Sequence, residues 1–209
     1  MIADTAYPGN MEIPGAIMTG YSTIFVEIAA QRDQPCDVVL LPAGVGGLFA
    51  AGAAHFVHGR GARRPRLVCV EPEDAACFLE SAVADDGLPH AARGRQKSLM
   101  AGLNCGLPSL LAWPVVRDTA DVFLAIEDTW AVDAMVASHR HGVVAGESGA
   151  AALAGLLALL RDDTLAAARA HLGLGADCRV LVVNTESDTD PELWARVTGV
   201  SPGASGGTP

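Results

Sequence analysis

The sequence predicts an α/β fold with a mostly parallel sheet and flanking helices. Three short apolar runs lack the polar alternation of half-buried strands, which is typical of strands covered on both faces. Segments with helical spacing of apolar residues lie between these runs, and such alternation gives layered α/β architectures. At 209 residues, of which 50% are hydrophobic, the chain is long enough to bury one sizeable core.

The predicted elements follow one another in a regular order. The predicted strands lie at 37–41, 66–70, 115–117, 122–126 and 179–183. The predicted helices lie at 20–30, 48–57, 74–83, 128–138, 149–161, 165–172 and 191–197. Asp74, Asp128 and Asp190 stand at or near the starts of three of these helices, where a carboxylate can accept hydrogen bonds from free N–H groups.

Charge and cysteine content argue against several classes of protein. Lys and Arg total 14 against 24 Asp and Glu, so a net charge of −10 disfavours a general nucleic-acid or membrane-surface binder. Five cysteines without a CxxC pair indicate free thiols, and we expect a reducing cytoplasm. The N-terminus lacks a signal-peptide pattern, and the longest apolar run, 150–160, is too short to cross a bilayer. No histidine spacing indicates a metal site.

A glycine-rich turn, Pro-Ala-Gly-Val-Gly-Gly-Leu at 42–48, joins a predicted strand to a predicted helix. Its glycines let successive N–H groups point at one place, and the helix N-terminus adds partial positive charge. Such a turn can hold a phosphate without a basic side chain. The pattern is neither GxGxxG nor a P-loop. The alternative interpretation is a tight turn that binds nothing.

Ligands of parallel sheets sit beyond the carboxyl ends of the strands, so the segments that end strands there matter most. These segments are 42–47, 71–72 and 185–190. The hydroxyl of Thr185 can hydrogen-bond a neutral ring nitrogen, whereas a carboxylate would keep that nitrogen protonated. The segment 185–190 is also typical of a polar turn that caps the following helix. A ligand-binding role and a capping role can coexist in the same segment. Ser148 lies in a weak match to Gly-x-Ser-x-Gly, but no buried strand leads into it, which disfavours a hydrolase.

Several motifs, in order along the chain, resemble one family. The turn at 42–48 is similar to the tetraglycine phosphate loop of fold-type II pyridoxal-phosphate (PLP) enzymes, which share the tryptophan synthase β-like fold. Val45 replaces one glycine of that loop. Within these enzymes the diaminopropionate ammonia-lyases are most similar. The motifs that carry this resemblance are Asp4-Thr-Ala-Tyr-Pro-Gly, Ala101-Gly-Leu-Asn-Cys-Gly, Gly146-Glu-Ser-Gly-Ala and Thr185-Glu-Ser-Asp-Thr-Asp.

The resemblance implies a set of site residues. The implied cofactor-binding residues are Gly44, Val45, Gly46, Gly47, Gly102, Glu147 and Thr185. The loop at 44–47 would cradle the phosphate through backbone N–H groups, and Thr185 would face the pyridine nitrogen. Gly102 and Glu147 would flank the ring. Asp4 would be an acid or base near the substrate.

The reaction implied by the resemblance is α,β-elimination of ammonia from 2,3-diaminopropionate, which gives pyruvate. The substrate is then a small amino acid and the full-length enzyme a homodimer. A serine/threonine dehydratase-type lyase of the same fold is the alternative activity. A nucleotide-binding protein or a catalytically inactive fragment is the alternative of another class. Ser187 stands where the family usually has Gly, which could shift that turn.

A PLP enzyme needs a lysine for its internal Schiff base. Lys97 is the only lysine of the chain, and its position does not match the family's Schiff-base lysine, which precedes the phosphate loop. We therefore expect residues 1–200 to form an incomplete large domain without its lysine segment and most of the small domain, as the C-terminal half of a longer enzyme. Residues 201–209 are expected to be a disordered tail. An incomplete sheet should leave apolar surface exposed and lower the solubility of the chain.

Overall fold

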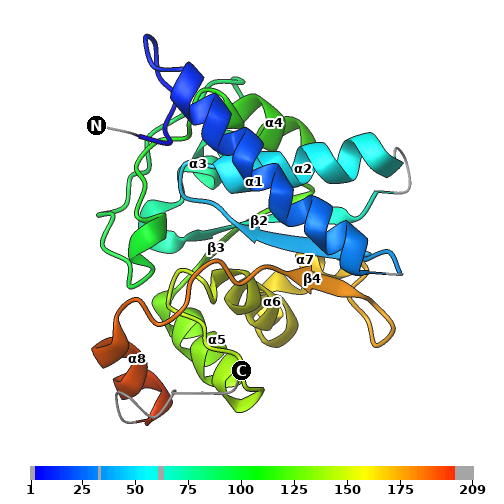
Figure 1. The fold of residues 1–209 in the computed structure, drawn as a ribbon, viewed down its shortest axis with the longest axis vertical. Coiled ribbons are helices and arrows are strands. Elements are labelled where there is room, and N and C mark those ends of the chain that lie inside the picture. The colour runs from blue at the N-terminus through cyan, green and yellow to red at the C-terminus, as the bar shows by residue number, and fades with distance from the viewer. Residues whose placement is uncertain (1–2, 33, 61–63, 201–209) are drawn as a thin grey trace.

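A four-stranded parallel sheet forms the centre of the protein (Figure 1). The computed structural model describes residues 3–32, 34–60 and 64–200. The strand order is β3-β2-β1-β4, and every pairing is parallel. The strands are β1 (Val38–Pro42), β2 (Arg66–Pro72), β3 (Val122–Ile126) and β4 (Val180–Val182). The predicted α/β class and parallel sheet are confirmed.

Helices cover both faces of the sheet (Figure 1). On one face lie α1 (Glu12–Gln31), α2 (Gly47–Arg60), α3 (Cys77–Ala84) and α4 (Ala112–Thr119). On the other lie α5 (Asp128–Arg140), α6 (Ala151–Arg161), α7 (Ala166–Leu172) and α8 (Pro191–Thr198). Short 3₁₀ turns occur at η2 (Glu73–Ala75), η3 (Ala101–Leu103) and η4 (Asp163–Leu165).

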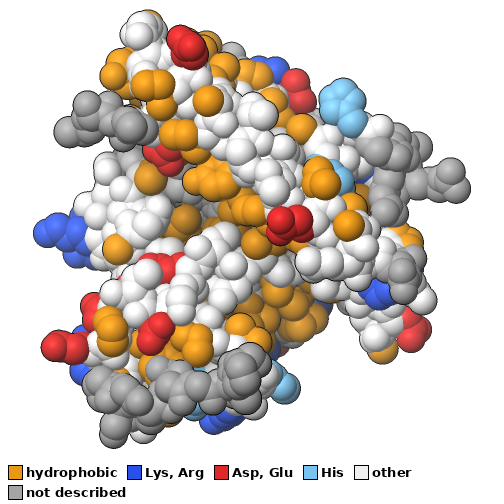
Figure 2. Space-filling model, viewed as in Figure 1, with side chains coloured by type: hydrophobic (Ala, Val, Ile, Leu, Met, Phe, Trp, Pro, Cys, Tyr) orange, Lys and Arg blue, Asp and Glu red, His pale blue; other side chains and the backbone are white. Residues whose placement is uncertain are grey.

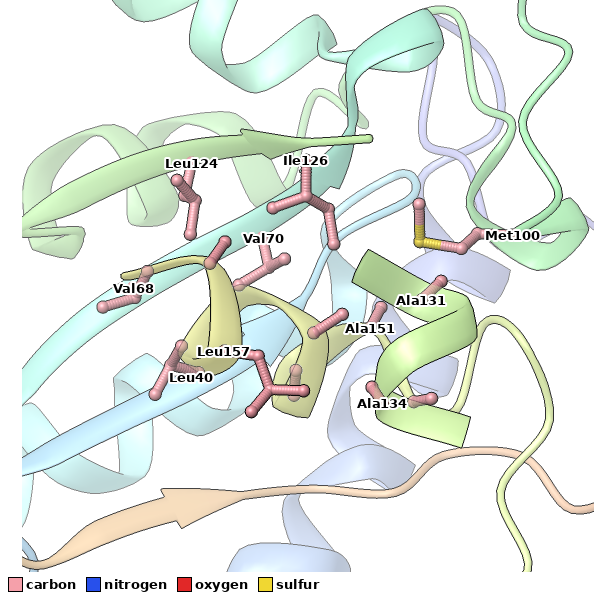
Figure 3. Packing of buried hydrophobic residues seen from close by; sticks show 14 of the residues in the cluster. Leu40, Val68, Val70, Met100, Leu124, Ile126, Ala131, Ala134, Ala151 and Leu157 are labelled. Carbon is pink, nitrogen blue, oxygen red and sulfur yellow. The ribbon is translucent and has the colours of Figure 1, made fainter. Parts of the chain in front are cut away.

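Alternate residues of the central strands serve two separate cores. Val38 and Leu40 of β1 pack among α5 and α6, whereas Val39 and Leu41 pack among α1 to α4. Figure 3 shows the first of these cores, in which Leu40, Val68, Val70 and Leu124 lie beside α6. Because both faces are buried, the sequence of β1 is apolar at every position rather than at every second one.

One predicted strand and the starts of some predicted helices differ from the structure. The strand predicted at 115–117 is wrong, because these residues belong to α4. Trp113 and Val116 are buried together at a helical spacing, and packing of this face overrides the strand preference of two adjacent valines. The first helix begins at Glu12 rather than at 20. Pro14 lies in its first turn, where the missing N–H has no partner to lose.

The helix starts test the three predicted caps. Asp190 is confirmed, since its side chain accepts a hydrogen bond from the Leu193 N–H at 2.9 Å. Asp128 is the first residue of α5 rather than its cap, and its carboxylate accepts hydrogen bonds from the 98–99 segment instead. Asp74 falls in η2, and α3 begins only at Cys77. The cap of α3 comes from elsewhere in the chain.

The first helix is apolar and largely exposed. Among the described residues, α1 alone is long and apolar enough to cross a membrane, by length and composition only, and 11% of its apolar window is buried. The core helix of a soluble protein can pass the same test, and α1 packs on α2 through the buried Phe25.

Figure 2, which has the same view as Figure 1, shows hydrophobic side chains gathered across the middle of the molecule. Tyr7, Met11 and Val26 are among the large hydrophobic residues that are exposed in the described part of the chain. The predicted tail at 201–209 lies outside the described residues.

Candidate functional site

A cavity of about 550 Å³ opens at the carboxyl edge of the sheet, beside the ends of β1 and β4. Its size lies within the usual range for small-molecule sites. Its lining residues come from the N-terminal segment, α1, the turn after β1, the 101–106 loop, the start of α6 and the segment after β4. They are Asp4, Tyr21, Ile24, Pro42, Gly44, Val45, Gly46, Gly47, Leu48, Gly102, Leu103, Cys105, Ser148, Val183, Asn184, Thr185 and Glu186.

The glycine turn forms one wall of this cavity and leads directly into α2. Gly46 adopts a φ of +91°, which a residue with a Cβ rarely does. A Cβ at Gly46 would also collide with the Phe78 ring, and one at Gly44 would lie 2.9 Å from the Cys105 sulfur. The turn therefore needs glycine for both conformation and space. Its N–H groups and the N-terminus of α2 form a site suited to an anion.

Ser109 joins the glycine turn to the N-terminal segment. Its N–H donates to the Val45 carbonyl at 3.0 Å, and its hydroxyl accepts from the Ala6 N–H at 2.9 Å. Ser109 is only 1% exposed, so solvent does not compete for these bonds. These contacts bring the segment that carries Asp4 to the cavity mouth, where Asp4 itself is exposed.

Glu186 braces another part of the cavity wall. Its carboxylate accepts hydrogen bonds from the Ser148 N–H at 3.0 Å and the Gly149 N–H at 3.3 Å, close to the N-terminus of α6. The Ser148 hydroxyl in turn accepts from the Gly102 N–H at 2.9 Å. This chain of bonds fixes three segments that are far apart in the sequence, and it places polar groups along one side of the cavity.

The structure brings together all but one of the site residues expected from the sequence. Asp4, the four residues of the glycine turn, Gly102 and Thr185 all line the cavity. Glu147 does not. It is 7% exposed, and one of its carboxylate oxygens has no hydrogen-bond partner among the described residues. Burial raises the pKa of Glu147, and the charges of Glu186 and Asp190 raise it further.

Sequence reasoning missed several lining residues. Ser148, Tyr21 and Ile24 are not among the expected site residues, although Ser148 lies within the Gly146-Glu-Ser-Gly-Ala motif and the other two lie within the predicted helix at 20–30. Glu186 follows Thr185 in the same motif, but its bracing role depends on Ser148 and Gly149, which lie 38 and 37 residues away in the chain. Ser109 gave no sign, because its partners are 64 and 103 residues away in the chain.

The residues that line the cavity suit the phosphate and the ring of PLP, but none of them carries an amine that could form the Schiff base. The turn at 44–47 can hold a phosphate, and the Thr185 hydroxyl can meet a ring nitrogen. Lys97 is exposed and does not line the cavity. No set of three or more His, Cys, Asp or Glu side chains suited to a metal ion occurs within residues 3–32, 34–60 and 64–200.

Comparison with known proteins agrees with this geometry. The family model described as pyridoxal-phosphate dependent enzyme matches residues 5–186, which is most of the chain. The chain belongs to this family. Its members depend on PLP, the cofactor whose phosphate and ring the cavity fits.

Named relatives narrow the similarity further. A diaminopropionate ammonia-lyase of Salmonella typhimurium is 36% identical over 204 residues, covering 93% of this chain and 50% of the relative. The crystal structure of the Escherichia coli diaminopropionate ammonia lyase with an aminoacrylate-PLP azomethine reaction intermediate is 32% identical. It has a TM-score of 0.83 and covers 94% of this chain and 51% of its own.

A more distant structure shows the shared fold alone. The processed form of threonine deaminase isoform 2 from Solanum lycopersicum is 21% identical with a TM-score of 0.70, covering 88% of this chain and 50% of its own. Fold-type II PLP enzymes are thus the structural neighbours, as the motifs predict. The chain spans about half the length of the diaminopropionate ammonia-lyases it matches.

Proposed function

We propose that this chain forms the cofactor-binding part of a PLP-dependent lyase that eliminates ammonia from 2,3-diaminopropionate and yields pyruvate. The observation that carries the proposal is the cavity itself. The glycine turn, the Gly102 loop and Thr185 belong to separate motifs of the sequence, and all three line this cavity. The names of the relatives in the same family support the choice of substrate.

When bound, PLP supplies an electron sink for a carbanion at the α-carbon of an amino acid. The N–H groups of 44–47 would hold the phosphate, and the Thr185 hydroxyl would hydrogen-bond the ring nitrogen. The Gly102–Ser148–Glu186 bonds join the loop at 101–106, the start of α6 and the segment after β4 at the cavity. Asp4, which is exposed and lines the cavity, would exchange a proton with the β-amino group of the substrate.

The residues of this chain do not supply the Schiff-base lysine, so we propose that a further polypeptide segment does. We also propose that the whole enzyme is a cytoplasmic homodimer without nucleic-acid or membrane partners. Free cysteines support the reducing compartment, and the acidic net charge supports the absence of a nucleic-acid partner.

Two measurements test the proposal. PLP is first titrated into the chain, and saturable binding is expected. Pyruvate formation is then measured with diaminopropionate, serine and threonine, for the chain alone and mixed with the half of the Escherichia coli relative that it does not cover. We expect no turnover alone and fastest turnover of diaminopropionate in the mixture. Faster turnover of serine or threonine would instead favour a dehydratase, and absence of PLP binding would refute the cofactor site.

A further inference from the structure

Glu71 is a fully buried carboxylate at the end of β2, with 0% exposure. It does not line the cavity, and the proposed mechanism does not use it. A buried charge is costly unless it is well paired. Its two oxygens accept hydrogen bonds from the Phe78 N–H at 2.8 Å and the Leu79 N–H at 2.9 Å. No cationic side chain pairs with Glu71 among the described residues.

These bonds make Glu71 the remote cap of α3. The residue before this helix is Ala76, whose side chain cannot accept a hydrogen bond. The first-turn N–H groups of a helix need acceptors, and a carboxylate there also meets the positive end of the helix dipole. Glu71 provides both from the preceding strand. It thereby fixes the position of the first turn of α3 relative to the sheet.

The first turn of α3 touches the glycine turn at two points. The Phe78 ring fills the space where a Cβ of Gly46 would lie. The Cys77 thiol lies 3.8 Å from the Gly44 carbonyl oxygen, at which it points as a weak donor. Phe78 also packs against Trp113, with ring centroids 6.1 Å apart. Any shift of this turn would therefore press on the glycine turn or leave it unsupported.

We propose that Glu71 is a positioning residue, which holds the anion-binding turn at 44–47 in its shape by anchoring the start of α3 beneath it. The identity of the anion as the PLP phosphate rests on the proposed function. The role of Glu71 in shaping the turn does not depend on the proposed function, because it concerns the chain without a ligand. The shape of the turn and the identity of the anion can therefore be tested separately.

The test compares Glu71→Gln with Glu80→Gln in the full chain. Glu80 lies on the same helix, but its carboxylate accepts from the Arg93 N–H and does not contact the glycine turn. Hydrogen exchange of the Ser109 amide, which donates to the Val45 carbonyl, reports on the turn. Amides of the central strand β1 report on global stability. The titration of PLP into each variant reports on anion binding.

We expect Glu71→Gln to accelerate Ser109 exchange about tenfold or more relative to β1, and to weaken PLP binding by about the same factor. Glu80→Gln should change neither. Equal acceleration of Ser109 and β1 would overturn the inference, since it would indicate general destabilisation only. An unchanged Ser109 rate would overturn it as well.

A second variant keeps the test decisive if Glu71→Gln does not fold. Phe78→Leu leaves the two hydrogen bonds to Glu71 in place but removes the ring beneath Gly46. It should accelerate Ser109 exchange selectively, and an unchanged rate would refute the proposed route. If the parent chain shows no PLP binding, the proposed function fails, while the exchange rates still decide the role of Glu71.

Discussion

Replacing Gly46 with alanine tests the structural basis of the anion site. Gly46 has a φ of +91°, and the left-handed conformation costs an L-residue about 1–2 kcal/mol. The new methyl group would also collide with Phe78 and lie 3.0 Å from the Ala112 Cβ. Overpacking in a rigid core costs about 1–3 kcal/mol more. Together these effects lower the free energy of unfolding by about 2–5 kcal/mol.

Gly142→Ala is the matched control. Gly142 has a φ of +75°, but a Cβ there meets no atom within 4 Å, so only the backbone cost applies. Urea unfolding of both variants separates the two contributions. We expect Gly46→Ala to be clearly the less stable and to lose PLP binding, while Gly142→Ala keeps it. Equal stability of the two variants, or normal PLP affinity of Gly46→Ala, would refute the reasoning.

Three further outcomes are expected. Burial raises the pKa of Glu71 to about 7, with Glu80 adding repulsion, so the folded protein holds a proton that the unfolded chain loses near pH 4.5. The free energy of unfolding should therefore fall by about 3 kcal/mol as the pH rises from about 4.5 to about 7. Urea titrations at several pH values should show a smaller fall in Glu71→Gln. Lys97→Arg should leave the PLP affinity unchanged in the same titration, because Lys97 does not line the cavity. Gly52→Ala should lower the unfolding free energy by about 1–3 kcal/mol, because its Cβ would lie 2.6 Å from Leu41, and an unchanged urea midpoint would contradict this packing.

The sequence contains enough local information to predict most of the fold and much of the site. The continuous apolar runs predict the buried strands, and the Asp190 cap follows from a carboxylate placed before a proline-led helix. The glycine turn is recognisable because strand, glycines and helix are adjacent in the chain. These features depend on neighbours within a few residues.

Features that depend on distant contacts could not be predicted in this way. The cap of α3 is Glu71 rather than Asp74, because the strand end reaches the helix start in space. The residues predicted as a strand at 115–117 are helical, because Trp113 and Val116 pack together. Glu147 is adjacent to the lining residue Ser148 but does not line the cavity itself, and a motif alone does not reveal that difference.

The most direct test of the site combines PLP titration with borohydride reduction of the parent chain and Lys97→Arg. We expect saturable binding of PLP with the same affinity in both proteins, because the turn at 44–47 holds the phosphate and Lys97 lies away from the cavity. Borohydride reduction should attach no more cofactor to the parent chain than to Lys97→Arg, because Lys97 does not line the cavity. Absence of saturable binding, or its loss in Lys97→Arg, would contradict a PLP site built from the glycine turn without a lysine of this chain.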